Sequence, residues 1–311
     1  MPLTKDTSET KTILITGGSG FIGQALTKEA LARGYKVHWM SRDVTSPVPD
    51  GVKVFGWNVN NKSMDHDAWV GVTHVVHLAG ANIGERSWSR IWKDAVMKSR
   101  IRSNSVLSGY ATSYANHNLE SVVLASGVGF YGTAGKDHIW TETEGPGTGF
   151  QAEVCIKWET AIALSFENLG ARTVTLRTGV VLNPKGGALA KMIPPVKLGI
   201  GSLGNGKQWV SWISLRDHVN LILFALENPE MSGTYNAVAP NPVTNAALTK
   251  VIAKSYKAFT LLPMVPAFLI RLFVGEMSEL VLGSIRCSAD KVLATGFKFG
   301  LPTLTKIDTD M

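Results

Sequence analysis

The stretch ILITGGSGFIGQAL, residues 13–26, joins an apolar run to a turn with glycine at positions 17, 20 and 23. Glycine lets the backbone of such a turn approach an anion closely, because no Cβ intervenes. The first N–H groups of the following helix and its positive dipole end then face that anion. The pattern predicts a strand–turn–helix unit that binds the pyrophosphate of a dinucleotide; the alternative is a tight turn without a ligand.

Short β-branched or apolar runs recur along the first part of the chain, with helical patterns between most of them. The runs cover residues 12–16, 36–40, 52–55, 74–78, 121–125 and 173–176. Strands that alternate with helices form a parallel sheet through right-handed crossovers, with helices on both faces. We therefore expect an α/β fold, a Rossmann doubly wound parallel sheet with a smaller C-terminal substrate lobe.

The alternation changes near residue 182, where a stretch rich in Gly and Pro begins. Such a composition is typical of loops, here around one short helix, and the C-terminal part of the chain predicts mainly helices. We expect three parts: a disordered leader over 1–11, an NAD(P)-binding domain over 12–182 that also receives 208–238, and a substrate lobe made of 183–207 and 239–311.

The most apolar stretch, FTLLPMVPAFLIRLFVG at 259–275, is interrupted by Pro263, Pro266 and Arg271. It is too short and too broken to span a bilayer, and it predicts a buried or amphipathic helix. The formal net charge is +7, but the basic residues are dispersed and no nucleic-acid-binding motif accompanies them. We expect a small-molecule substrate, no nucleic acid and no membrane as partner, and a monomer or homodimer.

The chain has two cysteines, Cys155 and Cys287, without CxxC spacing and without a Cys/His cluster. This pattern predicts neither a disulfide framework nor a metal site. The polar N-terminus lacks the apolar run of a signal peptide. We therefore expect a cytoplasmic protein.

The turn TGGSGFIG resembles the T-G-x-x-G-F-I-G signature of extended and atypical short-chain dehydrogenase/reductases. Further matches follow in chain order: HLAG (77–80), SGVGFYG (126–132), LRTGVVL (176–182), and the stretches ANIGERSW, CIKWETA, GSLGNGKQWVSWI and APNPVTNAAL. Together they resemble an atypical branch whose members are called epimerase-family or cell-division-inhibitor-like proteins. The resemblance covers about residues 12–300. It implies an NAD(P)-binding oxidoreductase or epimerase for an unidentified small substrate, sugar nucleotides being one class.

The same resemblance implies which residues contact the cofactor. They lie at the glycine turn, after the second and fourth strands, in the next helix and beyond the sixth strand: Gly17, Gly20, Phe21, Ile22, Gly23, Ser41, Arg42, Leu78, Ala79, Gly80, Arg100 and Val181. For Arg100, a plain surface arginine is the alternative.

The residues after the second strand separate NADP from NAD. Ser41 and Arg42 combine a hydroxyl with a guanidinium, which suits a ribose 2′-phosphate. Asp43 lies at about the distance from the glycines where an acid accepts hydrogen bonds from an unphosphorylated ribose. We favour NADP as cofactor, with NAD as the alternative and Arg42 as a solvated loop charge in that case.

Most enzymes of this superfamily use a Tyr-x-x-x-Lys pair, in which the lysine lowers the pKa of the tyrosine so that it can exchange a proton. None of the six tyrosines has a lysine four residues later. The resemblance aligns Gln151 with the tyrosine and Cys155 with the lysine, followed by Glu159 as the acid. Gln151 does not titrate, and Cys155 carries no positive charge. The standard pair is therefore absent.

Two other residues are candidate catalytic groups. Ser126 would bind a substrate carbonyl, and Tyr131 would supply a phenol whose pKa is lowered by Lys157 or Lys136. Each has a structural alternative, since Ser126 can bond the backbone at a strand end and Tyr131 can pack in the turn. The alternative function is therefore a catalytically silent NADP-binding protein, a redox sensor or a partner-binding module.

Overall fold

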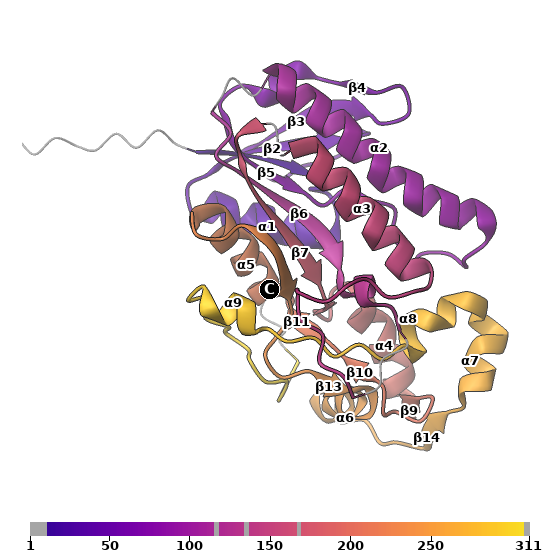
Figure 1. Ribbon diagram of the computed structural model, residues 1–311. Coiled ribbons are helices and arrows are strands. Elements are labelled where there is room, and N and C mark those ends of the chain that lie inside the picture. Colours follow the sequence, from indigo (N-terminus) through magenta and orange to yellow (C-terminus); the bar gives the residue numbers. More distant parts are fainter. Residues whose placement is uncertain (1–10, 115–117, 134–136, 167–168, 308–311) are drawn as a thin grey trace, which may run out of the picture.

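The computed structural model describes residues 11–114, 118–133, 137–166 and 169–307. The leader expected over 1–11 lies outside these residues except for Lys11. A large twisted sheet with helices on both sides fills one part of the molecule, and a smaller group of elements lies beyond one end of it (Figure 1).

An eight-stranded sheet has the order β12-β7-β6-β5-β1-β2-β3-β4. All neighbouring strands are parallel except β3 and β4. The strands are β1 (Thr12–Thr16), β2 (Lys36–Ser41), β3 (Val52–Asn58), β4 (Ser63–Met64), β5 (Val72–His77), β6 (Ser121–Gly127), β7 (Arg172–Thr178) and β12 (Gly233–Ala237). The doubly wound parallel sheet is confirmed; the sequence did not predict the antiparallel edge strand β4.

Two long helices cover each face of the sheet. Successive residues of a strand point to opposite faces, so each face packs in its own buried cluster. Ile13 and Ile15 of β1 pack in one buried cluster with α1 and α5, whereas Leu14 packs in another with α2 and α3. These helices are α1 (Phe21–Ala32), α2 (Arg90–Tyr114), α3 (Phe150–Phe166) and α5 (Leu215–Glu227). Burial on both faces explains why the strands are nearly continuous apolar runs.

The direction of winding reverses between β1 and β5, the two central strands. Their carboxyl ends lie side by side, since Thr16 is in register with His77. In open α/β sheets, ligands bind outside the carboxyl ends of the strands at this switch point. We therefore expect the ligand site at the loops that follow β1, β2, β5 and β6.

The smaller group contains three two-stranded pairs and several short helices. The pairs are β8 (Val180–Leu182) with β11 (Trp212–Ser214), β9 (Ile200–Leu203) with β14 (Leu262–Val265), and β10 (Trp209–Val210) with β13 (Val243–Thr244). Its helices are α4 (Gly187–Lys197), α6 (Asn245–Ser255), α7 (Ala267–Val274) and α8 (Glu279–Leu282), with the 3-10 helix η4 (Gly275–Ser278). Helix α9 (Asp290–Ala294) packs against β12 of the large sheet, and the 3-10 helices η1 (His66–Trp69) and η2 (Val128–Tyr131) also contact strands of that sheet.

Elements α4, β9, α6, β14 and α7 form what we term the small lobe. Its core contains Leu189 and Ile193 of α4, Leu248 and Ile252 of α6, and Trp212. Trp212 is fully buried, so its indole is core rather than a free stacking surface.

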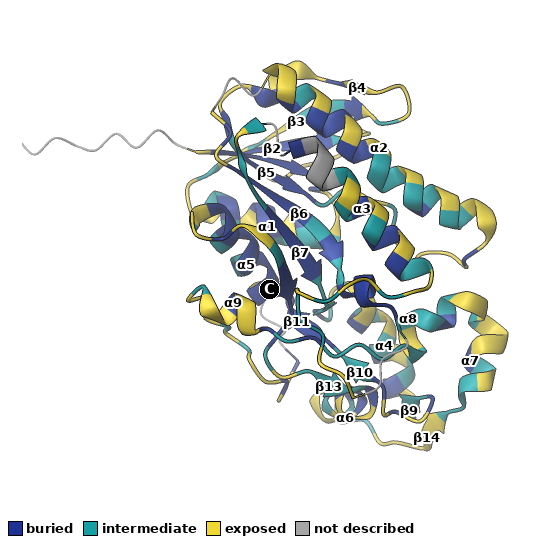
Figure 2. Ribbon diagram, in the orientation of Figure 1, coloured by how far each residue is buried: buried dark blue, intermediate teal, exposed yellow. Residues whose placement is uncertain are grey.

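The apolar stretch 259–275 differs from the expected single helix. Residues Leu262–Val265 form strand β14, and Pro266 then precedes helix α7. Ile270 is the buried residue of α7, and most of the helix is exposed (Figure 2). No helix among the described residues has the length and hydropathy needed to cross a membrane.

Candidate functional site

The glycine turn between β1 and α1 has a backbone that side chains would disturb. Gly17 has a φ of 72°, in the left-handed region that favours glycine. A Cβ on Gly23 would lie 2.2 Å from the carbonyl oxygen of Gly17, and a Cβ on Gly18 would lie 2.4 Å from the indole of Trp39. Gly20 is the N-cap of α1 and contributes no side-chain cap. The bare helix N-terminus is therefore suited to a bound anion.

The first residues of α1 link this turn to the neighbouring chain. The ring of Phe21 lies against Gly186, where a Cβ would come within 2.4 Å of it. Ile22 and Val181 pack against the same buried cluster as Phe21. The structure thus brings these three predicted residues to one side of the turn.

The turn after β5 touches the glycine turn directly. The N–H of Leu78 donates to the carbonyl of Thr16 at 3.2 Å, and the N–H of Ala79 donates to Thr16 Oγ1 at 3.2 Å. A Cβ on Gly17 would lie 3.1 Å from the carbonyl carbon of Leu78. Gly17, Leu78 and Ala79 therefore form one continuous surface.

A fully buried histidine lies beneath this surface. His77 Nδ1 is 2.6 Å from Thr16 Oγ1, and its Nε2 is 3.2 Å from Ser103 Oγ. The Thr16 hydroxyl accepts from Ala79, so its proton points to Nδ1; the Ser103 hydroxyl donates to the carbonyl of Arg100, so it accepts from Nε2. His77 is therefore the neutral Nε2–H tautomer, and burial lowers its pKa to about 3. We did not predict this residue, although HLAG begins with it.

Arg100 extends from α2 toward the same loops. Its Nη1 donates to the carbonyls of Ala81 and Val96 at 3.0 Å, and its guanidinium carbon lies 4.7 Å from the ring centroid of Trp158. A Cβ on Gly80 would lie 3.2 Å from its side chain. Burial lowers its pKa to about 10, and its Nε has no partner among the described residues. A guanidinium with an unused N–H suits a phosphate oxygen.

The loop after β2 holds the residues that we predict to discriminate between NADP and NAD. The Asp43 carboxylate accepts from the N–H and the hydroxyl of Thr45 and from the Ser46 hydroxyl at 2.6–2.9 Å. The bonds from Thr45 and Ser46 lower the pKa of Asp43 to about 2. Ser41 Oγ donates to the Asp43 carbonyl at 2.6 Å. The exposed Arg42 side chain makes no ion pair or hydrogen bond within the described part of the chain.

A buried chain of hydrogen bonds joins the two candidate catalytic residues. Ser126 Oγ donates to Glu159 Oε1 at 2.6 Å, and Arg177 holds both oxygens of Glu159 at 3.0 and 2.8 Å. Arg177 Nη1 also donates to the Tyr131 hydroxyl at 3.0 Å, and that hydroxyl donates to Asn236 Oδ1 at 2.8 Å. The structure therefore brings Ser126 and Tyr131 into one network through an ion pair.

Tyr131 is 2% exposed, and burial raises its pKa to about 12. Lys157, expected to lower that pKa, donates instead to Glu153 at 2.7 Å. The other expected lysine, Lys136, lies outside the described residues. Its surroundings therefore make the Tyr131 phenol a weaker acid than a solvent-exposed tyrosine.

Cys155, which the resemblance aligns with the superfamily lysine, is also held in an unreactive state. Cys155 is buried, its sulfur lies near Gly127, and burial raises the pKa of its thiol to about 11. Both cysteines of the chain are free and buried. Cys155 therefore fills space beside the end of β6.

The position of the superfamily tyrosine has a carboxylate beside it. Gln151 Nε2 donates to Glu279 Oε1 at 3.3 Å, and a Cβ on Gly149 would lie 3.0 Å from the same oxygen. Glu279 belongs to residues 275–282, which we term the strap. We did not predict this residue, because no local pattern relates positions 128 residues apart.

The strap is anchored to α2 as well as to α3. Glu276 forms an ion pair with Lys93, whose ammonium also lies 5.3 Å from the ring centroid of Phe150. Leu280 faces Gly84 in the loop after β5. The strap therefore crosses from the amino-terminal part of α2 to that of α3, over loops that follow β5 and β6 (Figure 1).

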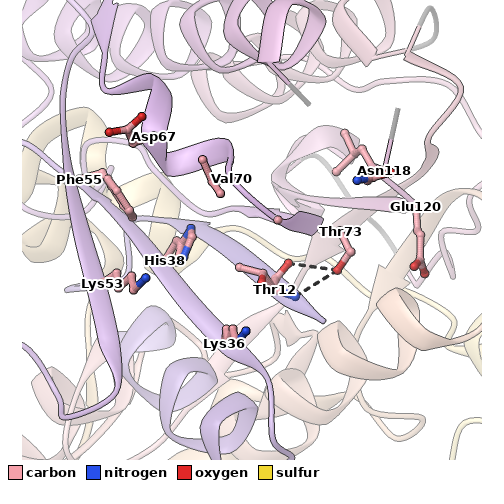
Figure 3. A pocket seen from close by; sticks show the side chains of 12 residues that line it. Thr12, Lys36, His38, Lys53, Phe55, Asp67, Val70, Thr73, Asn118 and Glu120 are labelled. Carbon is pink, nitrogen blue, oxygen red and sulfur yellow. Dashed lines mark hydrogen bonds between the residues drawn. The ribbon is translucent and has the colours of Figure 1, made fainter. Parts of the chain in front are cut away.

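A cavity of about 990 Å³ lies at the other end of the strands, the amino ends of β1 and β2 (Figure 3). Its lining includes Lys36, Lys53, Asp67 and Glu120, a mixture of basic and acidic side chains. None of the residues predicted to bind cofactor or to act in catalysis lines it. The switch point at the carboxyl ends remains the candidate site.

Comparisons with known proteins show the family to which the chain belongs. Residues 13–238 match the NAD dependent epimerase/dehydratase family, and residues 265–307 match DUF1731, a domain of unknown function. Epimerase family protein Mb2239 of Mycobacterium bovis is 38% identical over 92% of this chain and 93% of its own. The chloroplastic epimerase family protein SDR39U1 homolog of Arabidopsis thaliana is 34% identical over 93% of this chain and 83% of its own.

A solved structure extends the likeness to three dimensions. Human epimerase family protein SDR39U1, isoform 2, crystallised with NADPH, superposes with a TM-score of 0.82. The two are 29% identical, over 94% of this chain and 96% of the human one.

Proposed function

The chain belongs to the NAD dependent epimerase/dehydratase family, and on this premise we propose that it is an NADP-dependent oxidoreductase or epimerase acting on a small substrate. The main support for NADP as cofactor comes from the contacts of the loop after β2. The Asp43 carboxylate is bonded within its own loop, whereas the Arg42 guanidinium is exposed and unpaired within the described chain. The human relative crystallised with NADPH supports the same cofactor.

The residues present fit this dinucleotide. Gly23 lets α1 pack closely on the turn, because a Cβ there would collide with the Gly17 carbonyl, and the N-terminus of α1, which no side chain caps, would face the pyrophosphate. Arg42 would hold the 2′-phosphate, and the unpartnered Nε of Arg100 would donate to a second anionic group. The walls of the dinucleotide site would be supplied by Phe21, Ile22, Leu78, Ala79, Gly80 and Val181. Gly20 would lie at the glycine turn and Ser41 in the loop after β2.

A bound nicotinamide supplies or accepts the hydride. The protein must then hold the substrate oxygen and move its proton. We assign Ser126, at the end of β6, to binding that oxygen, and Tyr131 to positioning Arg177, because the phenol has two buried partners and a pKa of about 12.

Proton transfer falls to Glu279, beside the position of the missing tyrosine. In alcohol oxidation, the Glu279 carboxylate would take the proton from the substrate hydroxyl, and the nicotinamide would accept the hydride that leaves the carbon. In carbonyl reduction, the carboxylic acid returns that proton to the oxygen.

Calorimetric titration with NADPH, NADP, NADH and NAD tests the cofactor. We expect Arg42→Ala to weaken NADP(H) binding roughly tenfold to hundredfold, the effect of losing a charge-assisted hydrogen bond, and to leave NAD(H) unchanged. Asp43→Ala is the matched control and should change neither. Equal binding of NAD(H), insensitive to Arg42→Ala and lost in Asp43→Ala, would contradict the assignment to NADP.

A catalytically silent NADP-binding protein is the second candidate, favoured by Gln151 and Cys155 at the positions of the superfamily pair. A screen of aldehydes, ketones and nucleotide sugars for NADPH oxidation separates the two. Turnover of any member supports the enzyme; tight NADPH binding without turnover of any member supports the silent protein.

A further inference from the structure

The outer edge of the small lobe exposes large apolar side chains close together. Six of them are between 66 and 86% exposed, and we term them the apolar strip: Leu198, Phe259, Leu261, Phe268, Leu272 and Phe273. Helix α7 and the region around β14 lie at the margin of the molecule farthest from the helices α1 and α5 (Figures 1 and 2). Monomeric proteins rarely expose so many neighbouring apolar side chains without using them.

The strip comes from three segments, of which the two that carry Leu198 and Leu261 adjoin. The N–H of Leu261 donates to the carbonyl of Gly199 at 2.8 Å, which joins Leu261 to the turn that carries Leu198. Strand β14 follows Leu261 and leads through Pro266 into α7. In α7, Phe268 and Leu272 are four residues apart and share one face, whereas Ile270 is the buried residue.

Basic side chains border the strip. Lys197, Lys254 and Lys257 are exposed, and the Lys197 ammonium lies 5.2 Å from the ring centroid of Tyr256, which links the ends of α4 and α6. Exposed Arg271 lies within α7 between the strip residues. The chain from 231 to 275 contains no Asp or Glu but four basic residues, Lys250, Lys254, Lys257 and Arg271.

We propose that the apolar strip and its basic border dock the protein on the surface of an anionic phospholipid bilayer. Phenylalanine and leucine side chains insert at the boundary of head groups and acyl chains, and lysines at the border bind anionic head groups. A second copy of this chain fits less well, because two such faces would bring like charges together. The proposal goes beyond the expectation of no membrane partner, which concerned only a segment that spans the bilayer.

The test is co-flotation of the full chain with vesicles of phosphatidylcholine alone or of phosphatidylcholine and phosphatidylglycerol in equal parts. We expect flotation with the anionic vesicles, at least about tenfold weaker with the neutral ones and weaker in high salt. Phe268→Ser/Leu272→Ser/Phe273→Ser should abolish it, and Lys197→Gln/Lys254→Gln/Lys257→Gln should reduce it about tenfold or more.

Val70→Ser is the matched control, since this side chain is 68% exposed but lies by the cavity at the amino ends of β1 and β2, away from the small lobe; it should float like the parent chain. Thermal unfolding of every variant reports whether it is folded. Absence of flotation of the parent chain with anionic vesicles would overturn the proposal. So would equal flotation of the folded serine variant, or a dimer in sedimentation that the serine variant loses while vesicles bind neither.

Discussion

The side chains of Gln151 and Glu279 meet through a hydrogen bond of 3.3 Å, although 128 residues separate them. Gln151 belongs to α3, beside the large sheet, and Glu279 to the strap. This pair places a titratable carboxylate beside Gln151, the position that the resemblance aligns with the superfamily tyrosine. It also makes the proposed site depend on residues from both ends of the chain.

The first prediction concerns Glu279. Glu279→Gln keeps a hydrogen-bonding side chain but removes the base, so kcat with any substrate found in the screen should fall about a hundredfold or more. The Kd for NADPH should be unchanged. Glu276→Gln is the matched control, because Glu276 pairs with Lys93 and not with Gln151; we expect it to lose less than about tenfold. Unchanged turnover of Glu279→Gln would assign proton transfer to another group.

The second prediction concerns the glycine turn. Gly23→Ala introduces a Cβ 2.2 Å from the Gly17 carbonyl, so the turn must shift. We expect calorimetry to detect no NADPH binding and urea unfolding to show a loss of about 1–3 kcal/mol. The control is Gly109→Ala in α2, where nothing lies within 4 Å of the new Cβ; it should stabilise by about 0.5–1 kcal/mol. Normal NADPH affinity of Gly23→Ala would separate the turn from the cofactor.

The third prediction concerns the buried ion pair. Glu159→Gln leaves the Arg177 guanidinium charged, buried and without its carboxylate, and should cost about 3–5 kcal/mol in urea unfolding. Glu159→Gln/Arg177→Met removes both charges and should recover part of this loss. Ser126→Ala, which removes one hydrogen bond, should cost about 1 kcal/mol. If the double variant were less stable than Glu159→Gln, the pair itself would be the stabilising feature.

The fourth prediction concerns acid sensitivity. Burial lowers the pKa of His77 to about 3 and those of His74 and His218 to about 4. These groups are neutral in the folded chain, and they take up protons on unfolding below about pH 6.5. Their contribution to the free energy of unfolding is therefore complete above about pH 6.5. It is lost as the pH falls toward 4, at up to about 1.4 kcal/mol per pH unit for each histidine.

Urea unfolding at about pH 7.5 and about pH 5 measures this loss. His218→Leu removes one such group together with its unpartnered Nδ1 and should flatten the pH dependence. His66→Gln is the control, because the His66 side chain is 64% exposed. An equal slope in His218→Leu and the parent chain would show that His218 does not titrate between the two states.

Most of the sheet could be predicted from sequence because six of its eight strands are local apolar runs. A buried strand such as Thr12–Thr16 is a continuous apolar run, and Gly17 and Gly23 identify the turn behind it through backbone sterics alone. The two-residue strand β4 escaped prediction because its hydrogen bonds come from pairing with β3, not from its own pattern.

The polar residues of the site were harder to predict, since their roles depend on partners distant in sequence. His77 owes its neutral state to burial, with Thr16 and Ser103 beside its two ring nitrogens, and the buried Tyr131 hydroxyl finds its partners in Arg177 and Asn236. Propensity and spacing describe neighbours along the chain. They contain no information about which side chain will lie beside a residue after folding.

The order of synthesis gives the strap one further consequence. Every residue assigned to the dinucleotide, from Gly17 to Val181, leaves the ribosome before the strap at 275–282. The residues of the glycine turn are therefore synthesised before the segment that crosses the loops after β5 and β6. The contacts of Glu276 with Lys93 and of Glu279 with Gln151 can form only after residue 279 has been made.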